Sequence, residues 1–271
     1  MTSTLQYAVV GTGTVGTVLA QRFSDHHVPA LWANTRGPET IDVTELSASI
    51  TPATLDTALD ADVIILAIPF LQVRELGGRR PDWSGKIVVD ATNAFLVPNS
   101  PQILGGRLST EHNAEAFPGA AVVKSFNQTA ARQLAEKRPP EFGKRVVFVS
   151  SNDSAASATV AELCTELGFA PIELGRLDEG GVLIQARNAL VLRELYELPS
   201  ELEKHSGDVG GWAGSHPRHV DDRPRPLFHH VLGSPPDGRQ STWAIRRLLR
   251  GDHRARERNS EHCGHHRGRV G

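Results

Sequence analysis

The sequence predicts an α/β domain whose helices cover both faces of a doubly wound, mainly parallel sheet. Three observations support this prediction. Short apolar runs recur along the first 175 residues, segments of helical character separate them, and a glycine-rich turn joins the first run to the first helix. Continuous apolar runs are typical of strands that are buried on both faces, as parallel strands are. Alternation of strands and helices over this length favours one doubly wound domain.

The first strand, turn and helix are the most informative part of the chain. An apolar run at 7–10 leads into the pattern G-x-G-x-x-G, and a helix-compatible segment follows at 17–23. The pattern consists of Gly11, Thr12, Gly13, Thr14, Val15 and Gly16. In a dinucleotide site the first glycine permits the tight turn, the second lets the backbone approach the pyrophosphate, and the third allows close helix packing. The helix N-terminus then offers free N–H groups to the phosphates. We therefore predict a Rossmann-type nucleotide site, with a purely structural glycine turn as the alternative.

The end of the second strand, predicted at 28–33, indicates which dinucleotide is bound. An NAD-preferring site usually has a carboxylate there to bind the ribose hydroxyls. Asn34, Thr35 and Arg36 occupy this position instead. A guanidinium suits a phosphate, with which it forms charge-assisted hydrogen bonds. The sequence thus predicts NADP, with Arg36 on the 2′-phosphate; the alternative is that Arg36 is a solvated loop charge.

The remaining elements follow from the same alternation. Further strands are predicted at 63–68, 87–91, 121–126, 145–149 and 170–174. Helices are predicted at 54–61, 128–136, 155–167 and 182–198. Asp153 or Ser154 suits the N-cap of the third of these helices, and Gly168 follows its C-terminal end.

The chain changes character near residue 200. Residues 200–271 contain 13 Lys and Arg against 9 Asp and Glu, many Pro and Gly, and few apolar side chains. Such a composition buries too little apolar surface to offset the entropy of ordering. We therefore predict a nucleotide-binding domain at 1–199 and a mostly disordered, irregular tail at 200–271. A coding region read out of frame is an alternative origin for the tail. No metal site is predicted, because the Cys and His at 262–266 lack a second ligand pair at zinc spacing.

Composition limits the compartment and the partners. The chain has two cysteines, no apolar run of membrane-spanning length and no signal-like start, so a cytoplasmic protein is expected. Its net charge of −2 gives no reason to expect nucleic acid or a membrane as a partner. A small-molecule hydride acceptor and a homodimer are the partners that we expect.

Polar residues collect at the predicted strand ends, where ligands of open α/β sheets bind. The segment Ala67, Ile68 and Pro69 lies where the nicotinamide half of a dinucleotide would pass. Asn93 follows the next strand, and the strand after it is followed by the candidate substrate residues Ser125 and Asn127. Each Asn both donates and accepts hydrogen bonds, which suits a carboxamide or a flavin-like ring. The alternative is that these residues cap the loops or helices that follow.

No acid–base pair stands out, and no catalytic residue is assigned. His112 is expected at a helix start, in a surface or capping role. Cys164 falls on an apolar helix face and is expected in the core. Lys124 either approaches the site or forms an ion pair.

Taken together, the segments resemble a known family. The glycine loop, 34–36, 63–69, 88–93 and 122–127 occur in the order seen in deazaflavin-dependent NADP oxidoreductases, the NADPH:coenzyme F-420 reductases and their relatives. The resemblance covers about residues 5–185 and includes 168–181. It implies that the glycine loop binds NADP and that hydride moves between the nicotinamide and a second acceptor. The resemblance ends after about Leu190, so it implies nothing about the segment that would close the acceptor pocket.

The sequence therefore predicts an NADP-dependent oxidoreductase with a deazaflavin, coenzyme F-420 itself, or a flavin-like molecule as acceptor. Hydride transfer to such a ring needs orientation more than a protein acid. Two alternatives are open. One is the reduction of a small imine or carbonyl, and the other is a non-catalytic module that senses NADP.

Overall fold

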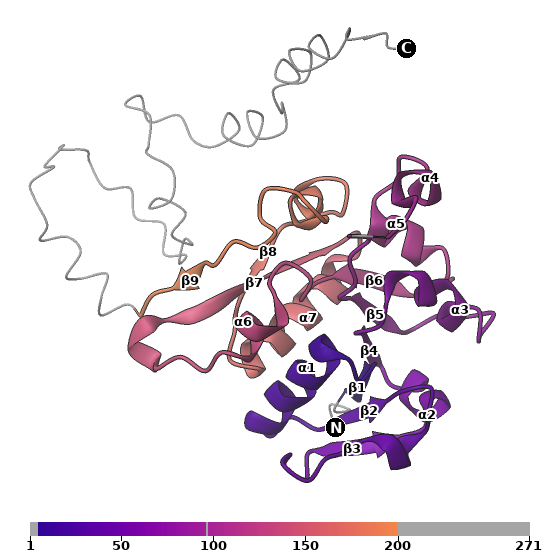
Figure 1. The fold of residues 1–271 in the computed structure, drawn as a ribbon. Helices are drawn as coiled ribbons and strands as arrows, with labels where there is room; N and C mark the ends of the chain where they lie inside the picture. The colour runs from indigo at the N-terminus through magenta and orange to yellow at the C-terminus, as the bar shows by residue number, and fades with distance from the viewer. Residues whose placement is uncertain (1–4, 96, 200–271) are drawn as a thin grey trace, which may run out of the picture. The chain divides into compact units, whose positions relative to one another are not determined.

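The computed structural model describes residues 5–95 and 97–199, and Figure 1 shows their arrangement. Nine strands form one sheet in the order β3-β2-β1-β4-β5-β6-β7-β8, and β9 pairs with β7. The strands are β1 Tyr7–Val10, β2 Ala30–Ala33, β3 Ile50–Ala53, β4 Val63–Leu66, β5 Ile87–Asp90, β6 Ala121–Lys124, β7 Lys144–Ser151, β8 Ala170–Glu173 and β9 Tyr196–Glu197. The predicted α/β class with a doubly wound, mainly parallel sheet is confirmed for this part of the chain.

The sheet is parallel from β3 through β6, and antiparallel pairing occurs at β7. β6 and β7 are antiparallel, with Val123 opposite Ser151. β8 is parallel to β7, and β9 is antiparallel to it. The carboxyl ends of β1, β2, β4, β5 and β6 therefore lie along one edge, where open α/β sheets bind their ligands.

Helices cover both faces of the sheet (Figure 1). The helices are α1 Thr14–Asp25, α2 Leu55–Leu59, α3 Val73–Gly77, α4 Ser100–Leu104, α5 Ser109–Ala114, α6 Ala131–Ala135 and α7 Ser154–Glu166. Short 3-10 helices lie at Pro38–Thr40, Phe70–Gln72, Pro140–Phe142 and Gly180–Ile184. Because successive strand residues point to opposite faces, each face has its own core: α1 and α7 pack on one, while α2 and α3 pack on the other.

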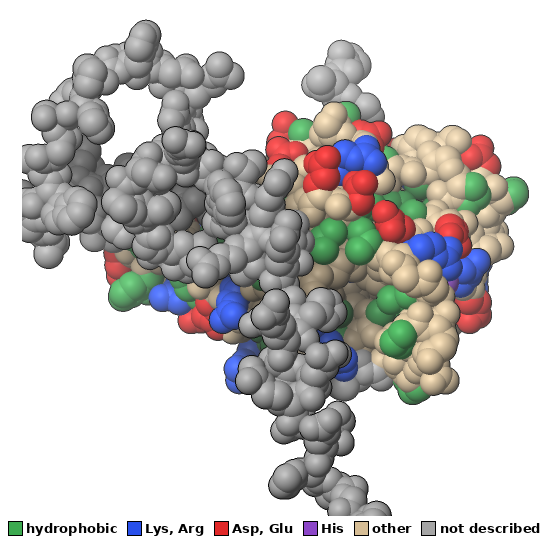
Figure 2. All heavy atoms as spheres, turned by 90° about the horizontal axis from the view of Figure 1, so that it is seen from above, with side chains coloured by type: hydrophobic (Ala, Val, Ile, Leu, Met, Phe, Trp, Pro, Cys, Tyr) green, Lys and Arg blue, Asp and Glu red, His purple; other side chains and the backbone are tan. Residues whose placement is uncertain are grey.

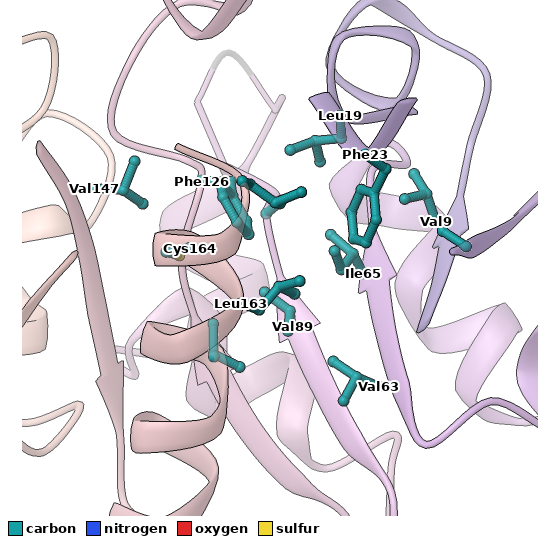
Figure 3. Packing of buried hydrophobic residues seen from close by; sticks show 14 of the residues in the cluster. Val9, Leu19, Phe23, Val63, Ile65, Val89, Phe126, Val147, Leu163 and Cys164 are labelled. Atoms are coloured by element: carbon teal, nitrogen blue, oxygen red, sulfur yellow. The ribbon is translucent and has the colours of Figure 1, made fainter. Parts of the chain in front are cut away.

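Figure 3 shows the core beneath α1 and α7. Leu19 and Phe23 of α1 pack near Val9 and Ile65 of the strands, and all four are buried. Cys164 of α7 lies in the same core, as expected, and has no exposed surface. Burial raises the pKa of its thiol to about 12. The thiol is therefore protonated at neutral pH and unreactive in the folded protein.

The caps of α7 match the sequence-based prediction. The Asp153 carboxylate accepts hydrogen bonds from the N–H groups of Ala155 and Ala156 at 2.9 and 3.0 Å. Gly168 follows the helix with a φ of 79°, the left-handed conformation that glycine adopts without strain.

Two elements differ from the prediction near the sheet's first edge and before β7. β3 was not expected, because Ile50–Ala53 contains Pro52 and only weak strand character. Its place at the sheet edge explains why a proline is tolerated there. The helix expected at 128–136 is confined to Ala131–Ala135. The Gln128 carbonyl instead accepts a hydrogen bond from the N–H of Leu192 at 2.6 Å.

The prediction of a helix at 182–198 is wrong. The segment forms a 3-10 turn, irregular loops and β9. Its polar groups bond elsewhere: the Asn188 side chain donates to the Val182 carbonyl at 2.6 Å, and the Leu195 carbonyl accepts from the N–H of Val146 at 2.9 Å. Leu192 also has a positive φ of 60°. Contacts with β7 and with residue 128 thus override the helical propensity.

Two further predictions concern a membrane span and the tail. No helix among residues 5–95 and 97–199 is long and apolar enough to cross a bilayer. The tail predicted at 200–271, with the Cys and His at 262–266, lies outside the described residues. Within them, no cluster of three or more His, Cys, Asp or Glu side chains has the geometry of a metal site.

Candidate nucleotide site

Two glycines where β1 passes into α1 are required by the fold itself. Gly11 has a φ of 117°, and a Cβ there would lie 2.2 Å from the Ala67 carbonyl oxygen. A Cβ on Gly16 would lie 2.0 Å from the Gly11 carbonyl oxygen. The Gly11 N–H also donates to the Ala33 carbonyl at 2.8 Å. The first glycine therefore permits the turn, and the third lets α1 begin directly against it.

Gly13 is different, because no contact within the described residues requires a glycine there. Its φ is −79°, which any residue adopts, and a Cβ there would meet no atom within 4 Å. The missing side chain leaves open space above the loop. This space is what a pyrophosphate needs in order to approach the backbone, so the loop fits a dinucleotide.

The N-terminus of α1 is open to an anion. Its N-cap, Gly13, provides no side-chain hydrogen bond, and its first turn contains no acidic residue. The N-terminus of α7 forms a useful contrast, because the Asp153 carboxylate already caps it. A hollow of about 550 Å³ beside α7 therefore has its helix N-terminus occupied by the protein's own anion. Of these two helix ends, only that of α1 offers free N–H groups to a phosphate.

A polar cluster connects the glycine loop to the end of β2. The Asn34 amide donates to the Thr12 hydroxyl at 3.3 Å and to the Thr40 hydroxyl at 3.0 Å. The Arg36 guanidinium donates to the same Thr12 hydroxyl at 3.4 Å, and its backbone N–H donates to Asn34 Oδ1 at 2.7 Å. Thr35 is exposed between them. Within the described part of the chain, no carboxylate forms a salt bridge with Arg36, so its charge is available to an anion.

Trp32 of β2 holds the glycine loop by a hydrogen bond from its side chain. Its indole N–H donates to the Gly11 carbonyl oxygen at 2.9 Å, and the residue is 5% exposed. The loop is thus held by β2 on one side and by α1 on the other.

The glycine loop continues into a pocket of about 310 Å³ at the carboxyl ends of β1, β4 and β5. Three backbone segments form its wall. The lining residues are Gly13, Thr14, Val15, Ala67, Ile68, Pro69, Phe70, Ala91, Thr92 and Asn93. The structure therefore brings most of the predicted cofactor residues together, and it adds Phe70, Ala91 and Thr92 to them.

The two asparagines named as candidates form a reciprocal pair beside this pocket. The Asn93 amide donates to the Asn127 backbone carbonyl at 2.8 Å, and the Asn127 amide donates to Asn93 Oδ1 at 3.1 Å. The Asn127 amide also donates to the Ile184 carbonyl at 2.6 Å. Asn93 lines the pocket, whereas Asn127 connects that wall to the segment after β8.

The other candidate substrate residue, Ser125, lies deeper. It has no exposed surface, and its hydroxyl donates to the Phe148 carbonyl at 3.0 Å. Ser125 therefore joins β6 to β7 and does not line the pocket. We do not retain it in the proposed acceptor site.

A fully buried ion pair lies under the pocket. Lys124 Nζ is 3.1 Å from Asp90 Oδ2, and neither side chain is exposed, so Lys124 forms the ion pair that was one of its two expected roles. Burial acts to raise the pKa of Asp90. The Lys124 charge and hydrogen bonds from Thr92 and Thr110 outweigh it, and the pKa lies below its usual value. Asp90 is therefore ionised at neutral pH.

His112 is buried rather than exposed, which corrects the expected surface role. It is 5% exposed, and its ring stacks on Phe70 with 5.7 Å between the centroids. Burial lowers its pKa, and the nearby charges of Arg74 and Arg107 lower it further. The imidazole is therefore neutral at pH 7. Both arginines also pair with Glu115, and on the face in Figure 2 charges of both signs are intermixed.

The fold and the family matches define the class of protein. The sheet has nine strands in a Rossmann-like order, and a pocket lies at the carboxyl ends of its strands. The glycine loop leads to a helix whose N-terminus has no side-chain cap. These are the parts of an NAD(P)-dependent oxidoreductase. Residues 6–94 match the family described as NADP oxidoreductase, coenzyme F420-dependent. The chain therefore carries a domain of this family, and membership implies that it binds NADP(H).

Individual relatives extend the likeness beyond that domain. The crystal structure of a hypothetical protein, SMa0349, from Sinorhizobium meliloti is 43% identical; the match covers 72% of this chain and 97% of that one, with a TM-score of 0.68. Metalloreductase STEAP2 of Homo sapiens is 30% identical over 165 residues, which are 61% of this chain and 28% of that protein. Metalloreductase STEAP3 of Rattus norvegicus is 32% identical over 117 residues, 43% of this chain and 23% of that protein. The chain thus spans about a quarter of these curated relatives.

Proposed function

We propose that this protein transfers hydride between NADPH and a deazaflavin or flavin-like acceptor. The glycine loop, Gly11 to Gly16, binds the pyrophosphate. Arg36, assisted by Asn34 and Thr35, binds the 2′-phosphate of the adenosine half. The pocket lined by Ala67–Pro69 and Asn93 receives the nicotinamide.

The observation that carries this proposal is the contact between Arg36 and the glycine loop. The guanidinium reaches Thr12 at 3.4 Å, and Asn34 holds both Thr12 and the backbone of Arg36. A cation without a carboxylate partner at the end of β2 is what a 2′-phosphate requires, because a carboxylate there would repel it. This arrangement favours NADP over NAD.

The chemistry of the pocket favours a flavin-like acceptor. A bound nicotinamide supplies the hydride. None of the ten described residues that line the pocket has an acidic or basic side chain. The protein residues therefore orient rings and exclude water, and they provide no proton donor of the kind that an imine or carbonyl needs.

The alternatives differ in what they require of the chain. Reduction of an imine or carbonyl requires a proton donor from outside the described lining. An NADP-sensing module requires binding without turnover. The curated relatives are named metalloreductases, but this chain matches about a quarter of their length, so we do not transfer metal reduction to it. Cytoplasmic location and a homodimer stay predictions.

An acceptor screen tests the proposal. Full-length protein is mixed with NADPH and with coenzyme F-420, FMN, FAD, an imine or a carbonyl compound, and NADPH absorbance is followed. Oxidation with the deazaflavin or a flavin supports the proposal, and Gly13→Val is the matched control without a cofactor site. Turnover with the imine or carbonyl alone, or tight NADPH binding with no turnover of any acceptor, would contradict it.

A further inference from the structure

The ion pair under the pocket is an unusual choice for a core position. Asp90 of β5 and Lys124 of β6 are register partners, and the neighbour of Asp90 on β4 is the apolar Leu66. A buried ion pair contributes little net stability, because the desolvation of two charges offsets their attraction. Apolar residues would hold the strands together equally well. The pair therefore calls for a role other than holding the sheet.

Asp90 collects hydrogen bonds from three segments of the chain. Its Oδ1 accepts from the N–H and the hydroxyl of Thr92 at 2.9 and 2.7 Å. Its Oδ2 accepts from the Thr110 hydroxyl at 2.8 Å and from the Asn113 amide at 3.2 Å. Lys124 also donates to the Thr92 carbonyl at 2.5 Å. Thr92 is thus held by its N–H, its hydroxyl and its carbonyl.

The same network extends to another wall of the pocket. Thr110 and Asn113 lie on α5, and so does His112, whose ring stacks on Phe70. Phe70 and Thr92 both line the pocket. One buried carboxylate therefore connects the segment after β5 with the segment after β4, on which the width and shape of the pocket depend.

We propose that Asp90 and Lys124 are positioning residues that hold these two walls of the pocket and thereby set the orientation of the nicotinamide. Neither residue lines the pocket, so both act through Thr92 and α5. This inference rests on the proposed function. It adds that the nicotinamide end depends on a buried polar network that the adenosine end does not share.

The decisive experiment compares two ligands on the full-length chain. NADPH occupies both ends of the site, whereas adenosine 2′,5′-bisphosphate lacks the nicotinamide half. The variant Asp90→Leu/Lys124→Met removes both charges together, so it leaves no unpaired buried charge. We expect it to bind NADPH about tenfold more weakly and the bisphosphate within about twofold of the wild type.

Two further variants separate positioning from stability. Val147→Ala removes packing from the opposite core, and we expect it to lower the melting temperature without changing the ratio of the two affinities. Thr110→Val removes one of the two hydrogen bonds that connect Asp90 to α5, the other coming from Asn113, and we expect it to lower the NADPH affinity relative to the bisphosphate affinity by a smaller factor. It decides the question if the double variant does not fold.

The outcomes are distinct. Equal losses for both ligands, or an unchanged NADPH affinity in a folded double variant and in Thr110→Val, would overturn the positioning role. If the wild-type protein binds the bisphosphate and NADPH equally, the nicotinamide makes no contact and the inference is wrong. If it binds neither ligand, the proposed function itself has failed.

Discussion

The two ends of the candidate site are built by different means. At the adenosine end, the glycine loop is shaped by backbone: Gly11 and Gly16 each exclude a Cβ by contact with a carbonyl oxygen. At the nicotinamide end, the wall is shaped by side chains from β5, β6 and α5 that meet at Asp90. The first arrangement depends on backbone carbonyls, one of them at Ala67, and the second depends on side chains up to 34 positions apart.

This difference predicts how each end fails. At the glycine loop, a side chain added where a backbone carbonyl is close should disrupt the fold, whereas one added where space is open should leave the fold intact. A side-chain network tolerates replacement of all its charges together better than loss of one.

Gly16→Val should prevent folding. Its Cβ would lie 2.0 Å from the Gly11 carbonyl oxygen, and the backbone of the turn cannot move away without breaking the Gly11–Ala33 hydrogen bond. We expect the free energy of unfolding to fall by several kcal/mol, which is a large part of the stability of a typical domain. Circular dichroism and thermal unfolding measure this. A folded variant with wild-type stability would show that the loop is more plastic than the structure indicates.

Gly13→Val should keep the fold and lose the cofactor. Among residues 5–95 and 97–199, no atom would lie within 4 Å of its Cβ, so the melting temperature should stay near that of the wild type. The side chain would occupy the space that a pyrophosphate needs. Isothermal titration with NADPH should then detect no binding. Normal NADPH affinity would mean that the loop is only a structural turn.

Arg36→Ala should discriminate between cofactors. The guanidinium is exposed and contacts Thr12, so its removal should not disturb the core. We expect NADPH binding to weaken by about 1.5–3 kcal/mol, as for a hydrogen bond to a charged group, and NADH binding to be nearly unchanged. Arg79→Ala, which removes an exposed arginine paired with Asp56, is the matched control. Equal losses for NADPH and NADH would contradict the assignment.

Acid should destabilise the fold by protonating Asp90. The pKa of Asp90 is lower in the folded protein than its usual value, so the ionised carboxylate stabilises the fold above its unfolded pKa of about 4. That stabilisation is lost as the pH falls through the folded value. Unfolding measured between neutral and acid pH should therefore show a steeper loss for the wild type than for Asp90→Leu/Lys124→Met. Parallel curves would show that Asp90 makes no such contribution.

How much of the fold the sequence predicts depends on how far along the chain the deciding contacts lie. The caps of α7 depend on neighbours within a few positions, and the glycine pattern is recognisable from its own spacing, so β1, α1 and α7 are predicted at about their observed places. β3 was missed because Pro52 is acceptable only at a sheet edge, and the edge is a property of the whole sheet. The helix expected at 182–198 fails for a related reason. Its residues have helical propensity, yet bonds to residues 128 and 146 decide their conformation.

The candidate site shows the same limit. Ala67, Ile68, Pro69 and Asn93 were proposed because ligands bind at the carboxyl ends of parallel strands, and the structure places them on one pocket. The burial of Ser125 was missed, because the reversal at β6 and β7 places Phe148 over it. The role of Asp90 has no sequence signal of its own, since its partners come from three separate segments.

The hydrogen bond between Trp32 and Gly11 gives the protein an optical probe of its own. The indole is buried at the base of the glycine loop, with its N–H on a backbone carbonyl of that loop. Tryptophan emits at wavelengths that the reduced nicotinamide absorbs, so a bound NADPH will quench this emission by energy transfer and itself become fluorescent. Excitation of tryptophan therefore reports occupancy of the site in real time, without a label. Trp32→Phe should weaken that signal, because three other tryptophans remain, and it removes one of the bonds that fix the loop.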